Sequence, residues 1–309
     1  MKNKNLKSLF NKNLIGRKNP IQKVFRSPIK MLYSILLAEI AKKYNRTYSL
    51  KASIFSGDKI NVIFPNADAL GIFRCGFIEE GLTSMVLKYL KPGDTFLDLG
   101  AHIGYYTLLA STIVEENGAV HSFEPTPSTF FILQSNCTDR SNIFLNNCAV
   151  FSVETFLTFN DYGIKNSERN SFVTGRFVDK KVLKNLTPKK ITVPSISIDK
   201  YVYQKKLIPD FIKIDVESAE YEVLKGMSQT IKNFKPIITI EVGDMEIEAI
   251  VQSRTCVEYL IERGYRAYEY KEGRIIKHGL KDRYSYDNLL FLPKRIHSKS
   301  NITDDSTSG

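Results

Sequence analysis

The chain has 309 residues, of which 43% are hydrophobic and 25% are charged, a composition typical of a globular protein that buries a full core. Its four cysteines form no C-x-x-C pair and show no metal-ligand spacing to the four histidines. This argues against a zinc site or a disulfide framework and favours reduced cysteines in a cytoplasmic protein. The formal net charge of +11 is unusual, so its distribution along the chain matters.

The N-terminal segment is strongly basic. Residues 1–30 contain nine lysines and arginines and no acid, and we expect a flexible basic arm. Residues 31–41, MLYSILLAEIA, form the candidate membrane segment, but they are fewer than the ~20 apolar residues that a span needs, and Glu39 interrupts them. We therefore expect an amphipathic helix that packs on the domain, with peripheral association at the inner membrane surface as an alternative.

From about residue 95, short apolar runs alternate with helical patterns. The expected elements, in chain order, are a strand at 95–100, a helix at 103–114, a strand at 119–125, a helix at 127–137, a strand at 142–150, a strand at 210–217, a helix at 219–234, a strand at 236–243, a helix from about 245 to 263, and strands at 265–270 and 288–294. This alternation predicts an α/β fold with a doubly wound, mostly parallel sheet, in which ligands bind outside the carboxyl ends of the strands. The polar, basic stretch 160–190 interrupts the pattern, and we interpret it as an insertion that covers a site.

The turn after the first of these strands, G-A-H-I-G at residues 100–104, indicates the kind of ligand. It lacks the G-x-G-x-x-G fingerprint of dinucleotide folds and the G-K-[ST] of a phosphate-binding loop. Gly100 and Gly104 permit close backbone approach, helix amides suit a carboxylate, and Asp98 suits a cationic amino group. Glu124 ends the second strand, where an acid binds ribose hydroxyls. An amino acid at one end and a ribose at the other, without a phosphate, describe S-adenosylmethionine.

The segments that carry these residues resemble the FkbM family of S-adenosylmethionine-dependent methyltransferases. They are LKPGDTFLDLGAHIGYY, VHSFEPTP, PDFIKIDVESAEYEVLKG, IITIEVG and NLLFLP. The resemblance is collinear from about Gly76 to Pro293. It implies a class I methyltransferase (Rossmann-like) fold with an antiparallel last strand, and methyl transfer to a hydroxyl of a sugar, glycan or natural product. Ser218 stands where the family usually has glycine, and His102, in the cofactor turn, where asparagine is frequent; we interpret Ser218 as a helix-capping residue.

We expect the chain to divide into three parts. These are a basic extension with a short amphipathic helix and accessory strands at 1–75, a methyltransferase domain at 76–295 that the resemblance covers, and a disordered polar tail at 296–309. The family carries an acid before the first strand, which Glu80 matches, and places the adenine near Ala149. Both residues are therefore expected at the cofactor.

Transfer to a hydroxyl requires a base or a metal to remove the proton. Asp215 and Glu217 follow the fourth main strand, where the methyl group is expected, and we predict that one of them is the base. Lys213 lies on that strand between apolar residues, so we expect it to be catalytic or to pair with Asp215 or Glu241. The acids show no clear ligand spacing, so no metal is predicted, with a divalent cation as the alternative.

The charge of the insertion bears on the acceptor. It is contributed by Lys165, Arg169, Arg176, Lys180, Lys181 and Lys184. Cations over a cleft favour an anionic acceptor, so we expect a small-molecule or glycan acceptor that bears acidic groups. The alternatives are a nucleic-acid-binding or RNA-modifying protein that uses the basic arm, and a Rossmann oxidoreductase; no RNA-binding signature accompanies the charge.

Overall fold

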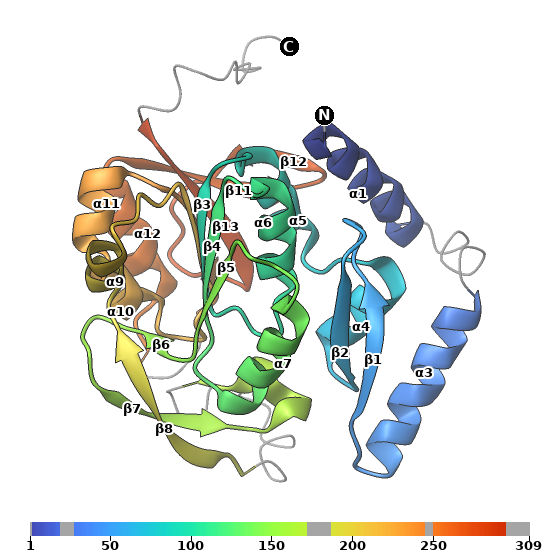
Figure 1. Ribbon diagram of the computed structural model, residues 1–309. Helices are drawn as coiled ribbons and strands as arrows, with labels where there is room; N and C mark the ends of the chain where they lie inside the picture. Colours follow the sequence, from blue (N-terminus) through green and yellow to red (C-terminus); the bar gives the residue numbers. More distant parts are fainter. Residues whose placement is uncertain (1, 19–27, 172–186, 245–249, 295–309) are drawn as a thin grey trace.

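The centre of the molecule is an eight-stranded sheet (Figure 1). The computed structural model describes residues 2–18, 28–171, 187–244 and 250–294. Across the sheet the strands are β12 (Arg274–Lys277), β11 (Tyr265–Lys271), β13 (Asp287–Pro293), β10 (Ile237–Val242), β9 (Phe211–Ile214), β3 (Thr95–Leu99), β4 (Ala119–Phe123) and β5 (Ile143–Asn146). The pairs from β10 to β5 are parallel, and β13 runs antiparallel between β10 and β11, which confirms the predicted sheet with its antiparallel last strand.

Helices cover both faces of this sheet. One face carries α5 (Glu80–Tyr89), α6 (Tyr105–Val114) and α7 (Pro127–Cys137), and the other carries α9 (Ile198–Lys205), α10 (Glu220–Lys225), α11 (Ser228–Phe234) and α12 (Ser253–Glu262). Because both faces are covered, all four residues of β9 are buried, including its lysine. The carboxyl ends of β3 and β9 therefore open between two packed layers.

The predicted third strand, 142–150, is wrong in its extent. Strand β5 ends at Asn146, and β6 (Ala149–Val150) belongs to a separate three-stranded sheet with β8 (Lys189–Ile196) and β7 (Phe156–Asp161). The side chain of Asn147 donates hydrogen bonds to the carbonyl oxygens of Glu124 and Pro125, at 2.8 and 3.2 Å, and so turns the chain away from the main sheet.

The predicted helix at 219–234 is also interrupted. The break lies at Gly226, where a Cβ atom would be 2.3 Å from the carbonyl oxygen of Phe151, so the neighbouring loop occupies the space of a side chain. Helix α11 then restarts, because the carboxylate of Asp199 accepts hydrogen bonds from the backbone of Gln229 and Thr230. The helix expected from about residue 245 begins only at Ser253, and residues 245–249 lie outside the described residues.

The N-terminal part folds onto the domain. It contains α1 (Lys2–Lys18), α3 (Pro28–Lys43), β1 (Tyr48–Ser53), β2 (Lys59–Phe64) and α4 (Ala67–Cys75). Phe10 of α1 is buried, with its ring 5.2 Å from that of Phe55 and 5.0 Å from that of Phe77. The expected flexible arm is therefore wrong for α1, because its apolar side chains find a site in a hydrophobic core that also contains residues of α5 and α6.

Residues 31–41 lie within α3, as the pattern predicts, and none of the described helices combines the length and apolar content needed to cross a bilayer. The polar tail at 296–309 lies outside the described residues, and the division at residue 75 stays a prediction.

The packing of α1 is open to a direct test. We expect Phe10→Ala to lower the free energy of unfolding by roughly 2–4 kcal/mol, because a buried ring leaves a cavity between two other rings. Leu9→Ala, at an exposed neighbour, is the matched control and should change it by less than about 0.5 kcal/mol. Chemical denaturation of both variants measures this; equal, small effects would mean that α1 does not pack in solution.

Candidate active site

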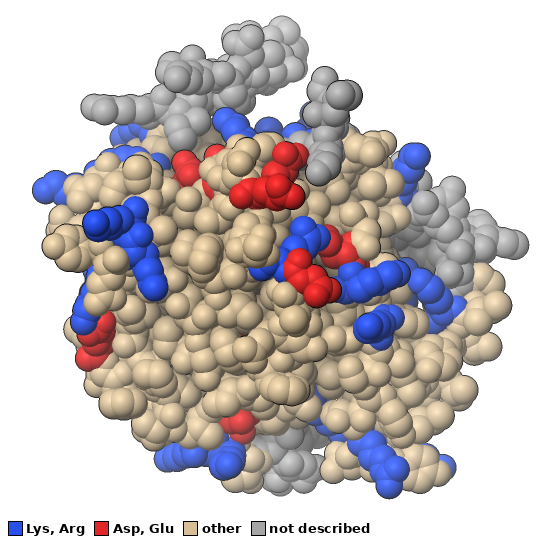
Figure 2. All heavy atoms as spheres, in the orientation of Figure 1, with Lys and Arg blue, Asp and Glu red and all other residues tan. Residues whose placement is uncertain are grey.

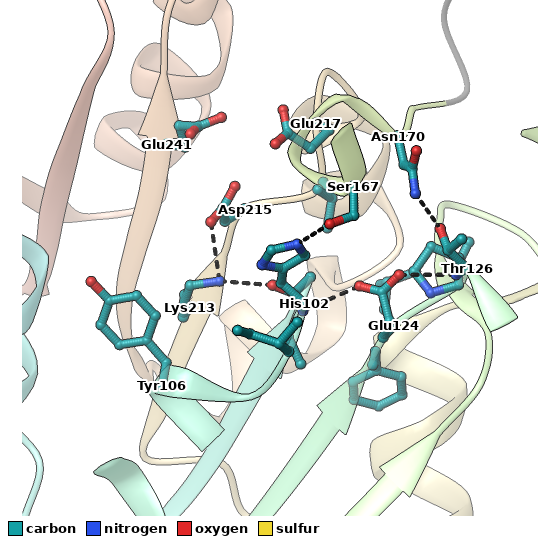
Figure 3. Close-up of a pocket in the computed structure, with 18 of the residues that line it drawn as sticks. His102, Tyr106, Glu124, Thr126, Ser167, Asn170, Lys213, Asp215, Glu217 and Glu241 are labelled. Carbon is teal, nitrogen blue, oxygen red and sulfur yellow. Dashed lines mark hydrogen bonds and ion pairs between the residues drawn. The ribbon is translucent and has the colours of Figure 1, made fainter. Parts of the chain in front are cut away.

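A cavity of about 360 Å³ lies at the carboxyl ends of β3, β4, β9 and β10 (Figure 3). Its walls come from α4, from the residue before α5, and from the segments that follow these four strands. This is the position at which ligands bind in doubly wound sheets. Glu124 lies on one side of the cavity, and Asp215, Glu217 and Glu241 lie on the other.

The two glycines of the first turn serve the packing of the chain itself. Gly100 has a φ of 82°, and a Cβ atom there would lie 1.7 Å from the carbonyl oxygen of Asp215. Gly104 has a φ of 96°, and its Cβ would meet the side chain of Leu133 at 2.7 Å. Gly100 lines the cavity, whereas Gly104 is the N-cap residue that precedes α6 and is not among the cavity residues. The sequence predicted that a ligand would approach the backbone at Gly100 closely. In the structure, the segment after β9 approaches it in this way.

A buried lysine forms part of the cavity wall. The Nζ of Lys213 is 3.2 Å from Asp215 Oδ2 and 3.3 Å from Asp98 Oδ1, and it donates a hydrogen bond of 3.0 Å to the carbonyl oxygen of Gly100. Burial acts to lower the pKa of Lys213, but the carboxylates of Asp215, Asp98 and Glu79 outweigh it and raise the pKa above its ordinary value. These contacts favour the charged form of Lys213, and the expected pairing with Asp215 is confirmed.

Asp98 is committed to this pair. Its carboxylate is fully buried and accepts a hydrogen bond of 2.7 Å from the hydroxyl of Thr107. Asp98 is not among the residues that line the cavity. The structure thus pairs Asp98 with Lys213, whereas the sequence predicted contact with the amino group of a ligand.

Glu124 is fixed in the cavity wall by backbone amides. Its Oε2 accepts a hydrogen bond of 3.1 Å from His102 N, and its Oε1 accepts one of 2.9 Å from Thr126 N. Burial raises the pKa of the Glu124 carboxyl to about 7. Its orientation at the end of β4 suits a pair of ribose hydroxyls.

The insertion forms part of the same wall. His102 Nε2 and the hydroxyl of Ser167 are 2.6 Å apart, and the side-chain amide of Asn170 donates to the hydroxyl of Thr126 at 3.2 Å. Ser167 lies in the short 3-10 helix η1 (Ile164–Arg169) of the insertion. Mainly apolar residues continue this wall, and Ala149, which was expected near the adenine, is among them. They are Phe123, Cys148, Ala149, Val150, Phe151, Leu157 and Phe159.

The opposite wall is acidic. Carboxylate oxygens of Asp215, Glu217 and Glu241 lie within 4.8 Å of one another, and we call these three residues the acidic corner. Among the described residues they form the one group of this kind that could hold a divalent cation, which prefers carboxylate oxygens. Burial and the carboxylate of Glu241 raise the pKa of Tyr286 above its ordinary value, so this hydroxyl is a hydrogen-bond donor beside the corner.

Glu79, which the sequence pattern did not single out, lines the cavity in place of Glu80. Glu79 accepts hydrogen bonds from the side chains of Asn288 at 2.7 Å, Tyr106 at 3.1 Å and Tyr286 at 3.3 Å. Burial first, and then the charge of Asp215, raises its pKa to about 7. Glu80 instead accepts a hydrogen bond of 2.8 Å from a tyrosine of β11 and is not among the cavity residues. The adjacent acids at 79 and 80 were the available signal, and the sequence alone does not distinguish them.

Backbone strain gathers at the cavity. Three of its lining residues, Glu79, His102 and Glu217, have φ in the left-handed region, at 40°, 50° and 59°. Ser218, which follows Glu217, has a φ of 80°. The interpretation of Ser218 as a cap is wrong, because Ala219 holds the position before α10 without a side-chain cap. Glycine and asparagine tolerate this region, which explains the family preferences at residues 218 and 102.

Known proteins match this chain over its central part. Residues 98–267 match the family model of the methyltransferase FkbM domain. The hexuronic acid methyltransferase AglP of Haloferax volcanii is 28% identical over 186 residues, which are 60% of this chain and 68% of AglP.

Solved structures that resemble the chain are more distant. Methyltransferase FkbM from Methylobacillus flagellatus KT has 17% identity and a TM-score of 0.40, with 72% of this chain and 52% of that chain covered. Fibrillarin of Aeropyrum pernix in complex with S-adenosyl-L-methionine has 15% identity and a TM-score of 0.38, with 65% and 67% covered. This chain thus spans about half of the Methylobacillus structure.

The raised pKa of Glu124 predicts a pH dependence of stability. In the folded state the pKa is about 7 against an ordinary 4.5, so the fold favours the protonated carboxyl. Stability is therefore lost as the pH rises from about 4.5 to about 7, by roughly 3 kcal/mol in total. We expect Glu124→Gln to lack this loss.

Denaturant unfolding at about pH 5 and about pH 8 measures the effect as the change in the stability difference between wild type and variant. Glu262→Gln, at an exposed carboxyl at the end of α12, is the matched control. Parallel pH profiles of wild type and Glu124→Gln would contradict the prediction.

Proposed function

This chain belongs to the FkbM methyltransferase family, and from that premise we propose that it transfers a methyl group to a hydroxyl oxygen of a sugar or glycan. It is a methyltransferase, and its methyl donor is S-adenosylmethionine. The observation that carries the proposal is the placement of Glu124 and the acidic corner on opposite sides of one cavity. On one side, Glu124 can accept hydrogen bonds from the ribose hydroxyls of the cofactor. On the other side, a carboxylate can act as the base.

The residues fit this cofactor. Glu124, held by the amides of His102 and Thr126, would bind the ribose hydroxyls, and the apolar wall around Ala149 would hold the adenine. The family resemblance implied an acid at Glu80, but the neighbouring Glu79, whose pKa is raised, is the acid that lines the cavity. When bound, S-adenosylmethionine supplies a methyl group activated by a sulfonium, so the protein chiefly has to orient the acceptor and take its proton.

Asp215 and Glu217 are the proposed bases. The side chain of Asp215 is 22% exposed and lines the cavity, and its ion pair with Lys213 fixes where the carboxylate lies. Lys213 itself, which is buried and raised in pKa, acts through Asp215 and not as a base. Glu217 lies two residues further along the same turn and faces the same corner.

The acceptor that we propose is an acidic sugar. The named activity of AglP is on hexuronic acid, and the insertion that forms part of the cavity wall is basic in sequence. Its Arg176, Lys180, Lys181 and Lys184, and the side chain of Arg169, lie outside the described residues. The acidic corner would repel an acceptor carboxylate, so that group has to point toward the insertion while the hydroxyl faces Asp215.

The alternatives receive less support. The described cavity wall carries six acids and a single lysine, which disfavours nucleic-acid phosphates there. The absent G-x-G-x-x-G disfavours an oxidoreductase. All four cysteines are free, and on that basis we infer a cytoplasmic protein; association with the inner membrane surface stays a prediction.

We predict that Asp215→Asn and Glu217→Gln keep cofactor affinity and lose turnover. Loss of the base should lower kcat by about 100-fold or more in at least one variant, while the dissociation constant of the cofactor changes little. Calorimetry and single-turnover methyl transfer measure the two quantities. Glu222→Gln, a carboxyl of α10 that pairs with Lys225 and is not among the cavity residues, is the control.

Normal turnover by both variants would place the base elsewhere, with His102 as the next candidate.

Activity measured in the presence of a chelator distinguishes a carboxylate base from a bound metal ion. We expect activity to survive a chelator; activity that is lost and then restored by Mg²⁺ would instead assign the acidic corner to a cation.

The acceptor prediction compares one sugar in its acidic and neutral forms. With a methyl-labelled donor we expect the uronic acid to react about tenfold faster than the neutral hexose at low salt, because cations over the cavity concentrate an anion. The advantage should decline as salt screens the charges. Equal rates without salt dependence would remove the insertion from acceptor recognition and leave the methyltransferase proposal intact.

A further inference from the structure

Helix α3 is buried on one side and exposes apolar side chains on the opposite side. On the inner side Ser34, Ala38 and Ala41 are buried against the domain. The other face carries a row of exposed residues that we call the outer stripe. The outer stripe consists of Ile29, Leu32, Leu36 and Ile40, which are 82%, 69%, 58% and 36% exposed. Their spacing of three, four and four residues places them on one line along the helix.

The outer stripe is not what a surface helix presents to water. The outward face of such a helix is normally charged or polar, and contiguous exposed apolar side chains mark a surface that another apolar phase covers. Helix α3 lies at the outer edge of the described structure, with the hairpin β1–β2 and α4 on its inner side (Figure 1). Tyr33, beside the stripe, adds a ring that is 46% exposed.

The charges around the outer stripe are mainly positive. Lys42, Lys43 and Arg46 are exposed where α3 ends, and we call these three residues the basic end. Figure 2 shows the edge along α3 as mainly tan, with blue side chains gathered at its lower end. Within α3 the one acid is Glu39, which pairs with Lys42 at 3.2 Å. The surface thus combines an apolar row with net positive charge.

We propose that the outer stripe and the basic end bind the surface of an anionic lipid bilayer. An apolar helix row that inserts to the level of the acyl chains, flanked by lysines at the headgroups, is the geometry by which interfacial helices bind anionic lipid. A second copy of this chain fits less well, because two such helices bring further cations to the same interface, and the one acid of each helix, Glu39, already pairs with Lys42.

The position of α3 connects this surface to the cavity. Helix α4 lies between them: its Arg74 donates a hydrogen bond of 2.7 Å to Ser34 of α3, and the rings of Phe73 and Tyr33 are 6.2 Å apart. From the same helix, Asp68 and Ile72 line the cavity. A bilayer that binds α3 therefore lies on the α4 side of the active site, which suits an acceptor displayed at a membrane. The binding itself is independent of the proposed reaction.

Co-sedimentation of the full chain with lipid vesicles tests the proposal. Wild type should bind vesicles that contain phosphatidylglycerol and bind pure phosphatidylcholine at least about tenfold more weakly. Leu32→Ser with Leu36→Ser should weaken binding by roughly tenfold to a hundredfold, because two side chains no longer enter the apolar layer. Lys42→Gln with Lys43→Gln should weaken it only on anionic vesicles and remove part of its salt dependence.

The matched control replaces exposed apolar residues elsewhere. Tyr203→Ser with Ile208→Ser changes side chains that are 84% and 66% exposed, at and after α9 on the far side of the sheet, and should bind vesicles like wild type. Thermal unfolding of each variant verifies the fold. The proposal is overturned if wild type does not bind anionic vesicles or if the α3 variant binds as well as the α9 variant. It is also overturned if the α3 variant merely converts a dimer into a monomer in size-exclusion chromatography.

Discussion

The buried ion pair network of Lys213 is the interaction on which the site depends. Its ammonium joins Asp98 of β3 to Asp215 after β9 and also binds the carbonyl oxygen of Gly100. Removal of one partner from a buried pair costs roughly 3–5 kcal/mol, because the remaining charge is left without compensation. The same contacts hold the ends of the two central strands at the spacing that makes the floor of the cavity. The network therefore fixes the position of Asp215, the proposed base, and places a cation beside it.

Several features of the site destabilise the folded protein. Glu79 and Glu124 are buried carboxyls with pKa values raised to about 7, and residues such as Glu217 and Ser218 hold left-handed backbone conformations. Each feature destabilises the empty fold by an amount of the order of a few kcal/mol or less. A ligand that donates hydrogen bonds to these carboxyls offsets that cost, so stability and binding are coupled at this cavity.

Residues that line the cavity also lie outside the segment that matches the family model. The matched segment begins at residue 98 and ends at residue 267, yet Asp68, Glu79 and Tyr286 lie outside it and line the cavity. The N-terminal part shares a hydrophobic core with α5 and α6, which is why α4 can serve as a wall. Differences in acceptor among relatives can therefore arise in segments that the family model does not match.

The sequence by itself determined the alternation of strands and helices that builds the main sheet, the glycine turn and the acids at the ends of β4 and β9, because periodicity and turn residues are local properties. It did not reveal the separate sheet of β6, β7 and β8, helix α9 or strand β12. The tertiary structure decided which neighbours these residues meet. Only packing distinguished Glu79 from Glu80, placed Asp98 on Lys213 instead of in the cavity, and folded a basic N-terminal segment into α1 through Phe10. Such outcomes depend on residues far apart in the chain, and no local pattern contains their distances.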